Sequence, residues 1–288
     1  MSKIKIFTDS TSDIPKKIQE EYGIEVLPLA ILDGEDEYAD GISMTPYEFY
    51  DFLESKEKLP STSRPTPGTF TNVYMKAWKE GYSDFIYVSI NSKGSSTYQG
   101  AVLEMENFYE DNPEAKNDIK IHIVDSLTYS MGYGFAVMEG AKAIKDGKDV
   151  DQVIACIKDW LEHCRIFFVP LNLRYVKKSG RVSAAAAFVG DALGLKPVIT
   201  FENGESKVIS KIRGEKKVTS EIIKMVQETR EPNSPYVLAT GMNKELGESF
   251  VAKVSEAMDK APDVVFPIGS VIAINSGPDI LGVIYKEK

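Results

Sequence analysis

Short apolar runs alternate with amphipathic segments through the first half of this chain. The apolar runs cover residues 3–8, 25–32, 85–90 and 119–124, and they predict buried strands. Apolar residues at helical spacing predict helices at 15–22, 45–56, 66–81, from residue 95, at 129–145 and at 150–164. Strands that alternate with helices in this way predict an α/β fold with a mostly parallel sheet covered by helices on both faces.

Residues 45–48 carry the clearest signal for the start of a helix. Their sequence, Thr-Pro-Tyr-Glu, is a capping box with proline at the first helical position. In contrast, Gly132-Tyr133-Gly134 lies inside a predicted helix and lacks the third glycine of a dinucleotide-binding loop. We interpret these glycines as sites of close helix packing.

The second half of the chain shows a different pattern. Asn203-Gly204 separates two apolar runs, 197–201 and 207–212, and predicts a β-hairpin. The other expected elements are strands at 166–169, 236–239, 270–274 and 280–285, and helices at 171–178, 184–193, 215–230 and 244–260. This antiparallel content predicts a second α/β domain, so we divide the chain into domains 1–164 and 165–288.

Composition excludes several classes of protein. The formal net charge is −9, which argues against binding to nucleic acid or to anionic membrane surfaces. The two cysteines, Cys156 and Cys164, exclude a disulfide scaffold and argue against a metal site, and we expect both as core thiols in one helix. No apolar run approaches the ~20 residues of a membrane span, and the first residues lack a signal-peptide pattern, so we expect a cytoplasmic protein.

Three hydroxyl-rich loops carry the candidate chemistry, at residues 8–13, 60–65 and 91–98. The first and third follow predicted strands and precede helices, where an open α/β sheet places its ligand. The second loop contains Pro60 and Pro65 and is followed by Pro67. Three prolines this close together make the segment stiff. Hydroxyls and free amides at helix starts suit a carboxylate or phosphate, so these loops predict a site for a small anion.

Each loop also has a structural interpretation. Asp9 and Ser10 fit either a ligand site, with Ser10 donating to an anion, or an Asx-type turn. Ser95 or Ser96 is suited to cap the following helix, which leaves Ser92 with no evident structural role. Gly94 would let the backbone approach a ligand closely.

Two basic clusters, 177–181 and 211–217, stand out in this acidic chain. They fit solvated helix ends, where cations are favoured by the helix dipole, or a docking surface for an acidic partner or a phosphate.

Taken in order, the loops resemble the DegV family of fatty-acid-binding proteins, which serve bacterial fatty acid kinase. The matching segments are Thr8-Asp9-Ser10, Pro60–Pro65, Asn91–Tyr98, Asp125-Ser126, Lys178-Ser179-Gly180-Arg181 and Gly277-Pro278-Asp279. They run over essentially the whole chain.

The resemblance implies a DegV-like fold of two α/β domains with a long-chain fatty acid between them. It implies that the hydroxyls of Thr62 and Ser92 hold the carboxylate. The other ligand-site residues that we expect are Ser10, Ser63, Ser95 and Asn275. Many family members have a histidine where this chain has Asn275, and asparagine can hydrogen-bond an anion but adds no charge.

The resemblance also implies that this chain is not itself an enzyme. A separate fatty acid kinase would phosphorylate the bound carboxylate to an acyl phosphate, and Arg181 and Arg213 would contact that partner or its phosphate. The fatty acid would be the ligand, with no cofactor and no stable insertion into a membrane. We expect a monomer, since it must present its ligand.

Two other classes of function stay open at this point. A small-molecule phosphotransferase or hydrolase would use the Asp9/Ser10 loop, with Asp9, Asp13 and Asp125 placed for a Mg²⁺ ion. With only two histidines, His122 and His163, a Ser-His-Asp hydrolase is disfavoured. The third class is a protein-binding domain whose interface is formed by the basic clusters.

Overall fold

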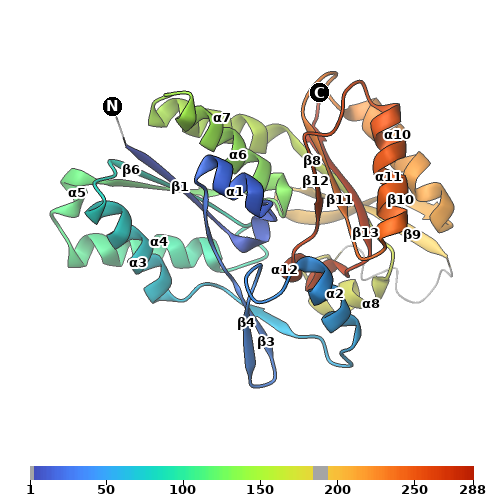
Figure 1. Cartoon of the computed structure of the whole chain (residues 1–288), viewed down its shortest axis with the longest axis horizontal. Helices are drawn as coiled ribbons and strands as arrows, with labels where there is room; N and C mark the ends of the chain where they lie inside the picture. Colours follow the sequence, from blue (N-terminus) through green and yellow to red (C-terminus); the bar gives the residue numbers. More distant parts are fainter. Residues whose placement is uncertain (1–2, 184–193) are drawn as a thin grey trace. The chain divides into compact units, whose positions relative to one another are not determined.

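The chain separates into two compact units, which we describe one at a time. In a computed structural model, residues 3–183 and 194–288 are described, so the helix expected at 184–193 lies outside them. Of the described residues, the first unit comprises 3–32, 37–39 and 62–162, and the second comprises 33–36, 40–61, 163–183 and 194–288. Figure 1 shows the elements of both units in chain order.

The first unit is built on a four-stranded parallel sheet with the order β2-β1-β6-β7. Its strands are β1 (Ile4–Asp9), β2 (Glu25–Leu27), β6 (Asp84–Ser89) and β7 (Lys120–Asp125). Its helices are α1 (Lys16–Tyr22), α3 (Pro67–Lys79), α4 (Thr97–Asp111), α5 (Ala115–Asp118), α6 (Met131–Lys145) and α7 (Val150–His163), with a 3-10 turn η1 (Ser10–Ser12) after β1. The predicted covered parallel sheet is confirmed.

Each face of this sheet packs against its own pair of long helices. Helices α3 and α4 lie on one face and α6 and α7 on the other (Figure 1). The face toward α3 and α4 is aromatic: the rings of Phe7 and Phe85 stack at 4.6 Å, and Tyr74 meets Phe85 edge-on. Burial of these side chains is the main stabilising contribution of this face.

Glycines on α6 allow the opposite face to pack closely, as the sequence predicts. A Cβ atom on Gly134 would lie 2.3 Å from the backbone oxygen of Ser12, and one on Gly140 would lie 2.8 Å from Ile157. The indole N–H of Trp160 on α7 donates to the backbone oxygen of Gly132 at 2.7 Å. Gly132-Tyr133-Gly134 therefore serves helix packing.

The single strand expected at 25–32 is wrong, because the chain forms two strands there. β2 ends at Leu27 and β3 (Ala30–Asp33) begins after Pro28, which has no N–H for a sheet ladder. A small sheet with the order β4-β3-β5 also contains β4 (Asp36–Ala39) and β5 (Ser61–Ser63). The sequence analysis missed β4 and β5 because they are short and polar.

The second unit is built on a six-stranded sheet with the order β10-β9-β8-β13-β11-β12. Its strands are β8 (Cys164–Pro170), β9 (Leu195–Glu202), β10 (Glu205–Arg213), β11 (Tyr236–Thr240), β12 (Val264–Pro267) and β13 (Ile280–Lys286). Its helices are α2 (Pro46–Glu54), α8 (Leu173–Ser179), α10 (Val218–Thr229), α11 (Lys244–Ala257) and α12 (Ser270–Ser276), with a 3-10 turn η2 (Glu215–Lys217). All neighbouring strands pair antiparallel except β11 and β12.

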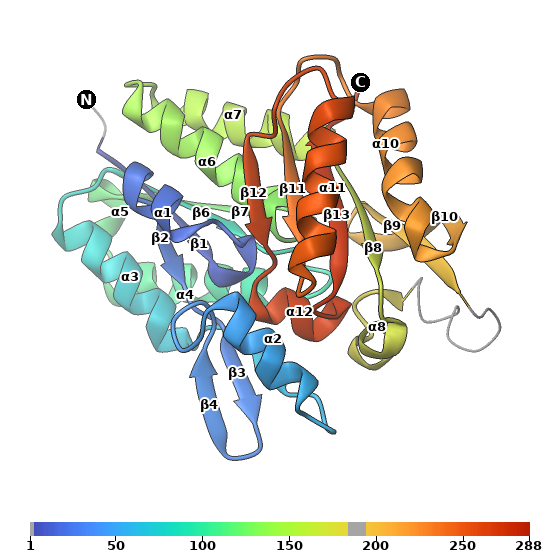
Figure 2. The ribbon, with the colours of Figure 1, turned by 45° about the vertical axis from the view of Figure 1, so that its right-hand side comes forward.

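Helices α10 and α11 lie side by side on one face of this sheet (Figure 2). The Asn203-Gly204 hairpin is confirmed, since both residues have positive φ, 49° and 79°, at the turn between β9 and β10. The capping box at the start of α2 is also confirmed, because Thr45 and Glu48 exchange hydrogen bonds there.

The strand expected at 270–274 is wrong, because these residues form helix α12. β-branched residues favour a strand locally, but here the helix packs against α8 and α2 and Ala273 N–H donates to Gly269 at 2.9 Å. The edge strand of the six-stranded sheet is β12, which precedes α12 in the chain and was not predicted from the sequence.

The cysteines also differ from expectation. Cys156 lies on α7, but Cys164 begins β8, so they do not share one helix. Both are partly exposed rather than core thiols. Cys164 is partly exposed because it is the first residue of β8, where packing is incomplete.

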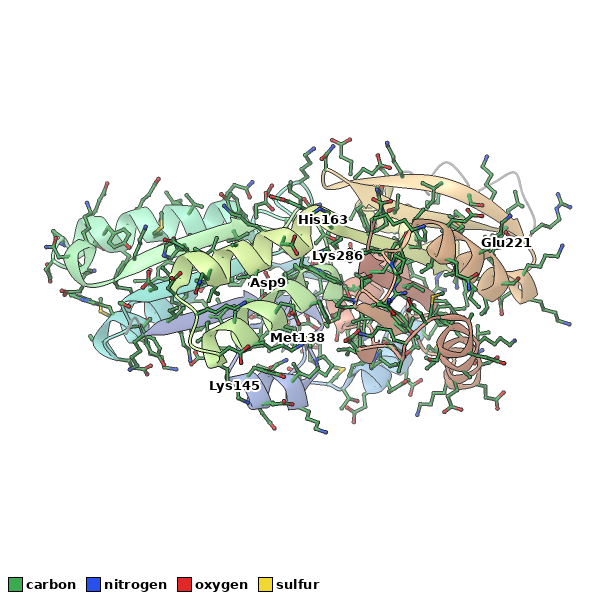
Figure 3. All side chains as sticks on the ribbon, turned by 90° about the horizontal axis from the view of Figure 1, so that it is seen from above. Asp9, Met138, Lys145, His163, Glu221 and Lys286 are labelled. Atoms are coloured by element: carbon green, nitrogen blue, oxygen red, sulfur yellow. The ribbon has the colours of Figure 1, made fainter. Side chains whose placement is uncertain are left out.

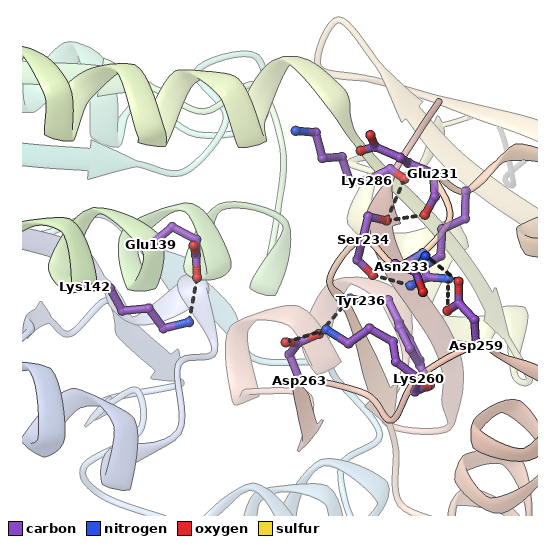
Figure 4. A network of polar contacts seen from close by, with 11 residues as sticks. Glu139, Lys142, Glu231, Asn233, Ser234, Tyr236, Asp259, Lys260, Asp263 and Lys286 are labelled. Carbon is purple, nitrogen blue, oxygen red and sulfur yellow. Dashed lines mark hydrogen bonds and ion pairs between the residues drawn. The ribbon is translucent and has the colours of Figure 1, made fainter.

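A buried arginine, Arg230, holds the connection between α10 and β11 by pairing with Asp259, which Figure 4 labels next to Asn233 of this connection. Arg230 is only 5% exposed and its Nη1 pairs with Asp259 Oδ1 at 2.8 Å, while Asp259 Oδ2 accepts the Asn233 N–H at 2.6 Å. Asp259 therefore fixes the connection between α10 and β11 by an ion pair with Arg230 and a hydrogen bond from Asn233.

The contact between α6 and η1 gives a direct test of the first unit. We expect Gly134→Ala to lower the free energy of unfolding by about 1–3 kcal/mol, because the added methyl would overlap the backbone oxygen of Ser12. Gly68→Ala is the control, since nothing lies within 4 Å of a Cβ at this position in the first turn of α3. Equal stability of both variants in urea unfolding would contradict this packing.

Candidate functional site

Three loops of the first unit meet where its parallel strands end. β1, β6 and β7 run in the same direction, so the segments after them share one edge of the sheet. The N–H of Asn91 donates to the oxygen of Thr128 at 3.2 Å, and the N–H of Ser126 donates to Ser89 at 3.2 Å. The hydroxyl-rich loop 91–98 is therefore fixed against the loop 125–130.

Asp9, at the end of β1, is the buried polar centre of this edge (labelled in Figure 3). Its Oδ1 accepts from Thr11 N–H at 3.2 Å, from the Thr11 hydroxyl, and from Tyr133 at 2.6 Å. Its Oδ2 accepts from Tyr87 at 3.1 Å and from Ile90 N–H at 3.0 Å. The predicted Asx-type turn is present, and it is part of a wider network that joins β1, β6 and α6.

This network restricts the chemistry of Asp9. Complete burial raises the pKa of the Asp9 carboxyl above its ordinary value of 3.8, although hydrogen bonds from Thr11, Tyr133, Ile90 and Tyr87 lower it. The N–H of Thr11 faces one carboxylate oxygen and the N–H of Ile90 faces the other. In an Asp9→Asn variant, the side-chain NH2 group would therefore face a backbone donor in either orientation of the amide. With five hydrogen bonds on it, Asp9 has no accepting capacity left for a metal or substrate.

The other two acidic residues of the expected Mg²⁺ site are also engaged. Asp125 Oδ1 accepts the N–H groups of Ser92 and Leu127 at 3.1 and 3.2 Å, and Asp13 Oδ2 accepts the Ser130 hydroxyl at 2.5 Å. No group of three metal-ligating side chains was found among residues 3–183 and 194–288. In the same ranges, no helix has the length and apolar character needed to cross a membrane.

Within loop 91–98, the hydroxyls have distinct roles. The Ser95 hydroxyl accepts the Thr97 N–H, the first of α4, at 3.3 Å and lies 2.7 Å from the Thr97 hydroxyl, whereas Ser96 occupies the N-cap position and its side chain makes no capping hydrogen bond. The backbone of Ser92 is held by Asp125, but its hydroxyl has no hydrogen-bond partner among the described residues. Ser92 is thus a positioned and unused donor at the edge of the sheet.

Gly94 makes room for a protein side chain. A Cβ atom there would lie 2.1 Å from the hydroxyl oxygen of Tyr129, so the expectation of a close approach by a ligand is replaced by contact with Tyr129. The sequence analysis missed Tyr129, since it lies in another loop.

The proline-rich loop places Thr62 on β5. Exposure alternates along this strand: Ser61 and Ser63 are exposed, whereas Thr62 and Arg64 are half-buried. The Thr62 hydroxyl has no hydrogen-bond partner in the described part of the chain, and that of Ser63 makes only a 3.4 Å contact to the Arg64 oxygen. Thr62 is therefore the better donor of the two toward a ligand.

Ser10 connects the Asp9 turn to the start of β3. Its hydroxyl accepts the Leu29 N–H at 3.0 Å, which leaves its proton free to donate. Ser10 has a structural role whether or not it meets a ligand.

The remaining predicted residues lie in the second unit. Asn275 is in the last turn of α12, where its side-chain amide donates to Val271 at 2.7 Å. Arg181 is exposed and donates to the Ser179 oxygen at 2.9 Å, and Arg213 is exposed at the end of β10. Their relation to a ligand is considered below as a proposal.

The titration of Asp9 gives a testable pH dependence. A raised pKa means that Asp9 favours the folded state most below about pH 3.8, and that this contribution is lost as pH rises through the folded pKa. Tyr133→Phe removes a donor that favours ionised Asp9, so it raises this pKa further. We expect its cost in unfolding free energy to grow from acid to neutral pH, reaching about 1–3 kcal/mol. The test is urea unfolding of the variant and wild type across this range, and a cost independent of pH would contradict it.

Comparisons with known proteins agree with this arrangement. A DegV domain-containing protein of Clostridium perfringens is 33% identical over 99% of both chains. A structure described as fatty acid binding of a DegV family protein from Thermus thermophilus has a TM-score of 0.85 and 28% identity, covering 99% of both chains. A stearic acid-binding protein from Eubacterium ventriosum has a TM-score of 0.88 and 26% identity, covering 99% of this chain and 97% of that one.

The family model described as "Uncharacterised protein, DegV family" matches residues 3–288, which is nearly the whole chain. This range contains the hydroxyl-rich loops and the described residues of both units. The chain belongs to the DegV family.

Proposed function

We propose that this protein binds a long-chain fatty acid and that the hydroxyls of Thr62 and Ser92 hold its carboxylate. The observation that carries this proposal is the Ser92 hydroxyl, which is fixed through its backbone by Asp125 and has no partner among the described residues. Similar proteins support it, since the Thermus thermophilus and Eubacterium ventriosum structures are described as fatty acid binding. Ser10, Ser63, Ser95 and Asn275 remain proposed members of the ligand site.

The acyl chain would supply most of the affinity. Burial of each methylene contributes about 0.8 kcal/mol, so a C16 chain contributes roughly 10 kcal/mol before ordering costs. The hydroxyls would mainly prevent an unpaired buried carboxylate, which is expensive. A role in binding also fits Asp9, whose oxygens are occupied by five donors and are not available for catalysis.

We further propose that the protein presents its ligand to a separate kinase. The kinase would transfer a phosphoryl group from ATP to the carboxylate oxygen, which gives an acyl phosphate and ADP. Exposed Arg181 and Arg213 are suited to contact the partner or its phosphate. The proposal includes a monomer in the cytoplasm and two functional domains, 1–164 with the hydroxyl loops and 165–288.

The first test is mass spectrometry of an organic extract of the purified protein, followed by titration of delipidated protein with palmitate. A stoichiometric fatty acid, or saturable binding, is the expected result. A lipid-free extract together with no binding in the titration would overturn the proposed function.

The ligand-binding hydroxyls can be tested one at a time. We expect Thr62→Ala and Ser92→Ala each to weaken palmitate binding about ten- to a hundredfold, the loss of one hydrogen bond to a charged group, with an unchanged melting temperature. Ser61→Ala removes an exposed hydroxyl from the same strand as Thr62 and is the matched control. Full binding by both Thr62→Ala and Ser92→Ala would reject these residues as the carboxylate site.

The kinase step can be tested separately. We expect Arg181→Glu and Arg213→Glu to bind palmitate normally but to lower acyl phosphate formation by a bacterial fatty acid kinase at least about tenfold. The product is measured as the hydroxamate after trapping with hydroxylamine. Lys16→Glu, an equal charge reversal on exposed α1, should leave the rate unchanged. Normal rates in both arginine variants would argue against this contact.

A further inference from the structure

Arg64 is a cation beside the hydroxyl loops that has no anionic partner among residues 3–183 and 194–288. It follows β5 directly, in the same proline-rich loop as Thr62, and its side chain is half-buried. No ion pair or hydrogen bond from its guanidinium to another described residue is found. A half-buried guanidinium has lost part of its hydration, so an unpaired one calls for an anion.

A glycine on a neighbouring helix makes the position of this guanidinium possible. A Cβ atom on Gly100 would lie 2.0 Å from Nη1 of Arg64, so the guanidinium lies directly on the backbone of α4. Gly100 is the fourth residue of this helix and no positive φ requires glycine there. Space for the guanidinium is the physical reason that the structure offers for glycine at this position.

Arg64 is connected to both segments that carry the proposed carboxylate donors, through the chain to Thr62 and through its guanidinium to α4. Thr62 and Arg64 are two residues apart along an extended segment, so their side chains point to the same, less exposed side. Gly100 lies one turn into α4, directly after the loop that carries Ser92 and Ser95. Arg64 therefore spans from the Thr62 side of the site to the helix that begins at the Ser92 loop.

We propose that Arg64 is the charged group that recognises the carboxylate of the fatty acid, and that Gly100 seats it. This inference rests on the proposed function and adds to it. The hydroxyls of Thr62 and Ser92 are neutral donors, and nearby Asp9 and Asp125 are acidic. A guanidinium supplies the charge and the paired donors that distinguish a carboxylate from an alcohol or an ester.

The test compares two probes that share an acyl chain, palmitate and 1-hexadecanol, by titration of the delipidated full-length protein. We expect Arg64→Gln to weaken palmitate binding about tenfold and to leave hexadecanol binding within about twofold of wild type. Gly100→Ala keeps the charge but displaces the guanidinium, so it should weaken palmitate binding as well. Arg64→Lys should retain part of the affinity, because it keeps the charge and loses the paired donors.

Lys79→Gln is the matched control, since it removes one positive charge at the far end of α3 and should change neither affinity. Unchanged palmitate binding by Arg64→Gln, or equal losses for palmitate and hexadecanol, would overturn the role of Arg64 and leave fatty acid binding intact. Failure of the wild-type protein to bind either probe would instead overturn the proposed function.

Discussion

The buried carboxylate of Asp9 is the constraint on which the candidate site depends. It lies at the end of β1 with complete burial, and desolvation makes each of its five hydrogen bonds necessary. Two of these bonds come from backbone amides and two from tyrosine hydroxyls on β6 and α6. The ends of β1 and β6 and the start of α6 are thereby fixed to Asp9. The positions of the loops that follow β1 and β6 depend on this connection.

A second carboxylate, that of Asp125, fixes the hydroxyl-rich loop 91–98. Asp125 accepts the backbone N–H groups of Ser92 and of Leu127, so the loops after β6 and β7 are fixed to each other. The two hydroxyls that would meet a ligand, those of Thr62 and Ser92, have no hydrogen-bond partner within the described residues. Some residues therefore position the loops and others bind the ligand. A donor whose hydrogen bond is already made within the protein cannot also donate it to a ligand.

Local patterns in the sequence predict the parts of this structure that depend on neighbours along the chain. The buried strands β1, β6 and β7, the capping box of α2 and the Asn203-Gly204 turn are all of this kind. Contacts between distant residues were not accessible: Tyr87 and Tyr133 are 78 and 124 residues from Asp9, and no local pattern connects them. For the same reason α12 was mistaken for a strand, since its β-branched residues became helical through packing against α8 and α2.

The bonds of Asp125 have a consequence for the evolution of this loop. Both are made to main-chain N–H groups, which every residue except proline provides. At position 92 the path of the loop is therefore independent of the identity of the side chain, proline excepted, whereas Gly94 and Ser95 are constrained by contacts of their own. Substitutions at position 92 can change what the loop recognises while its shape persists, so new ligand preferences are reachable by single mutations.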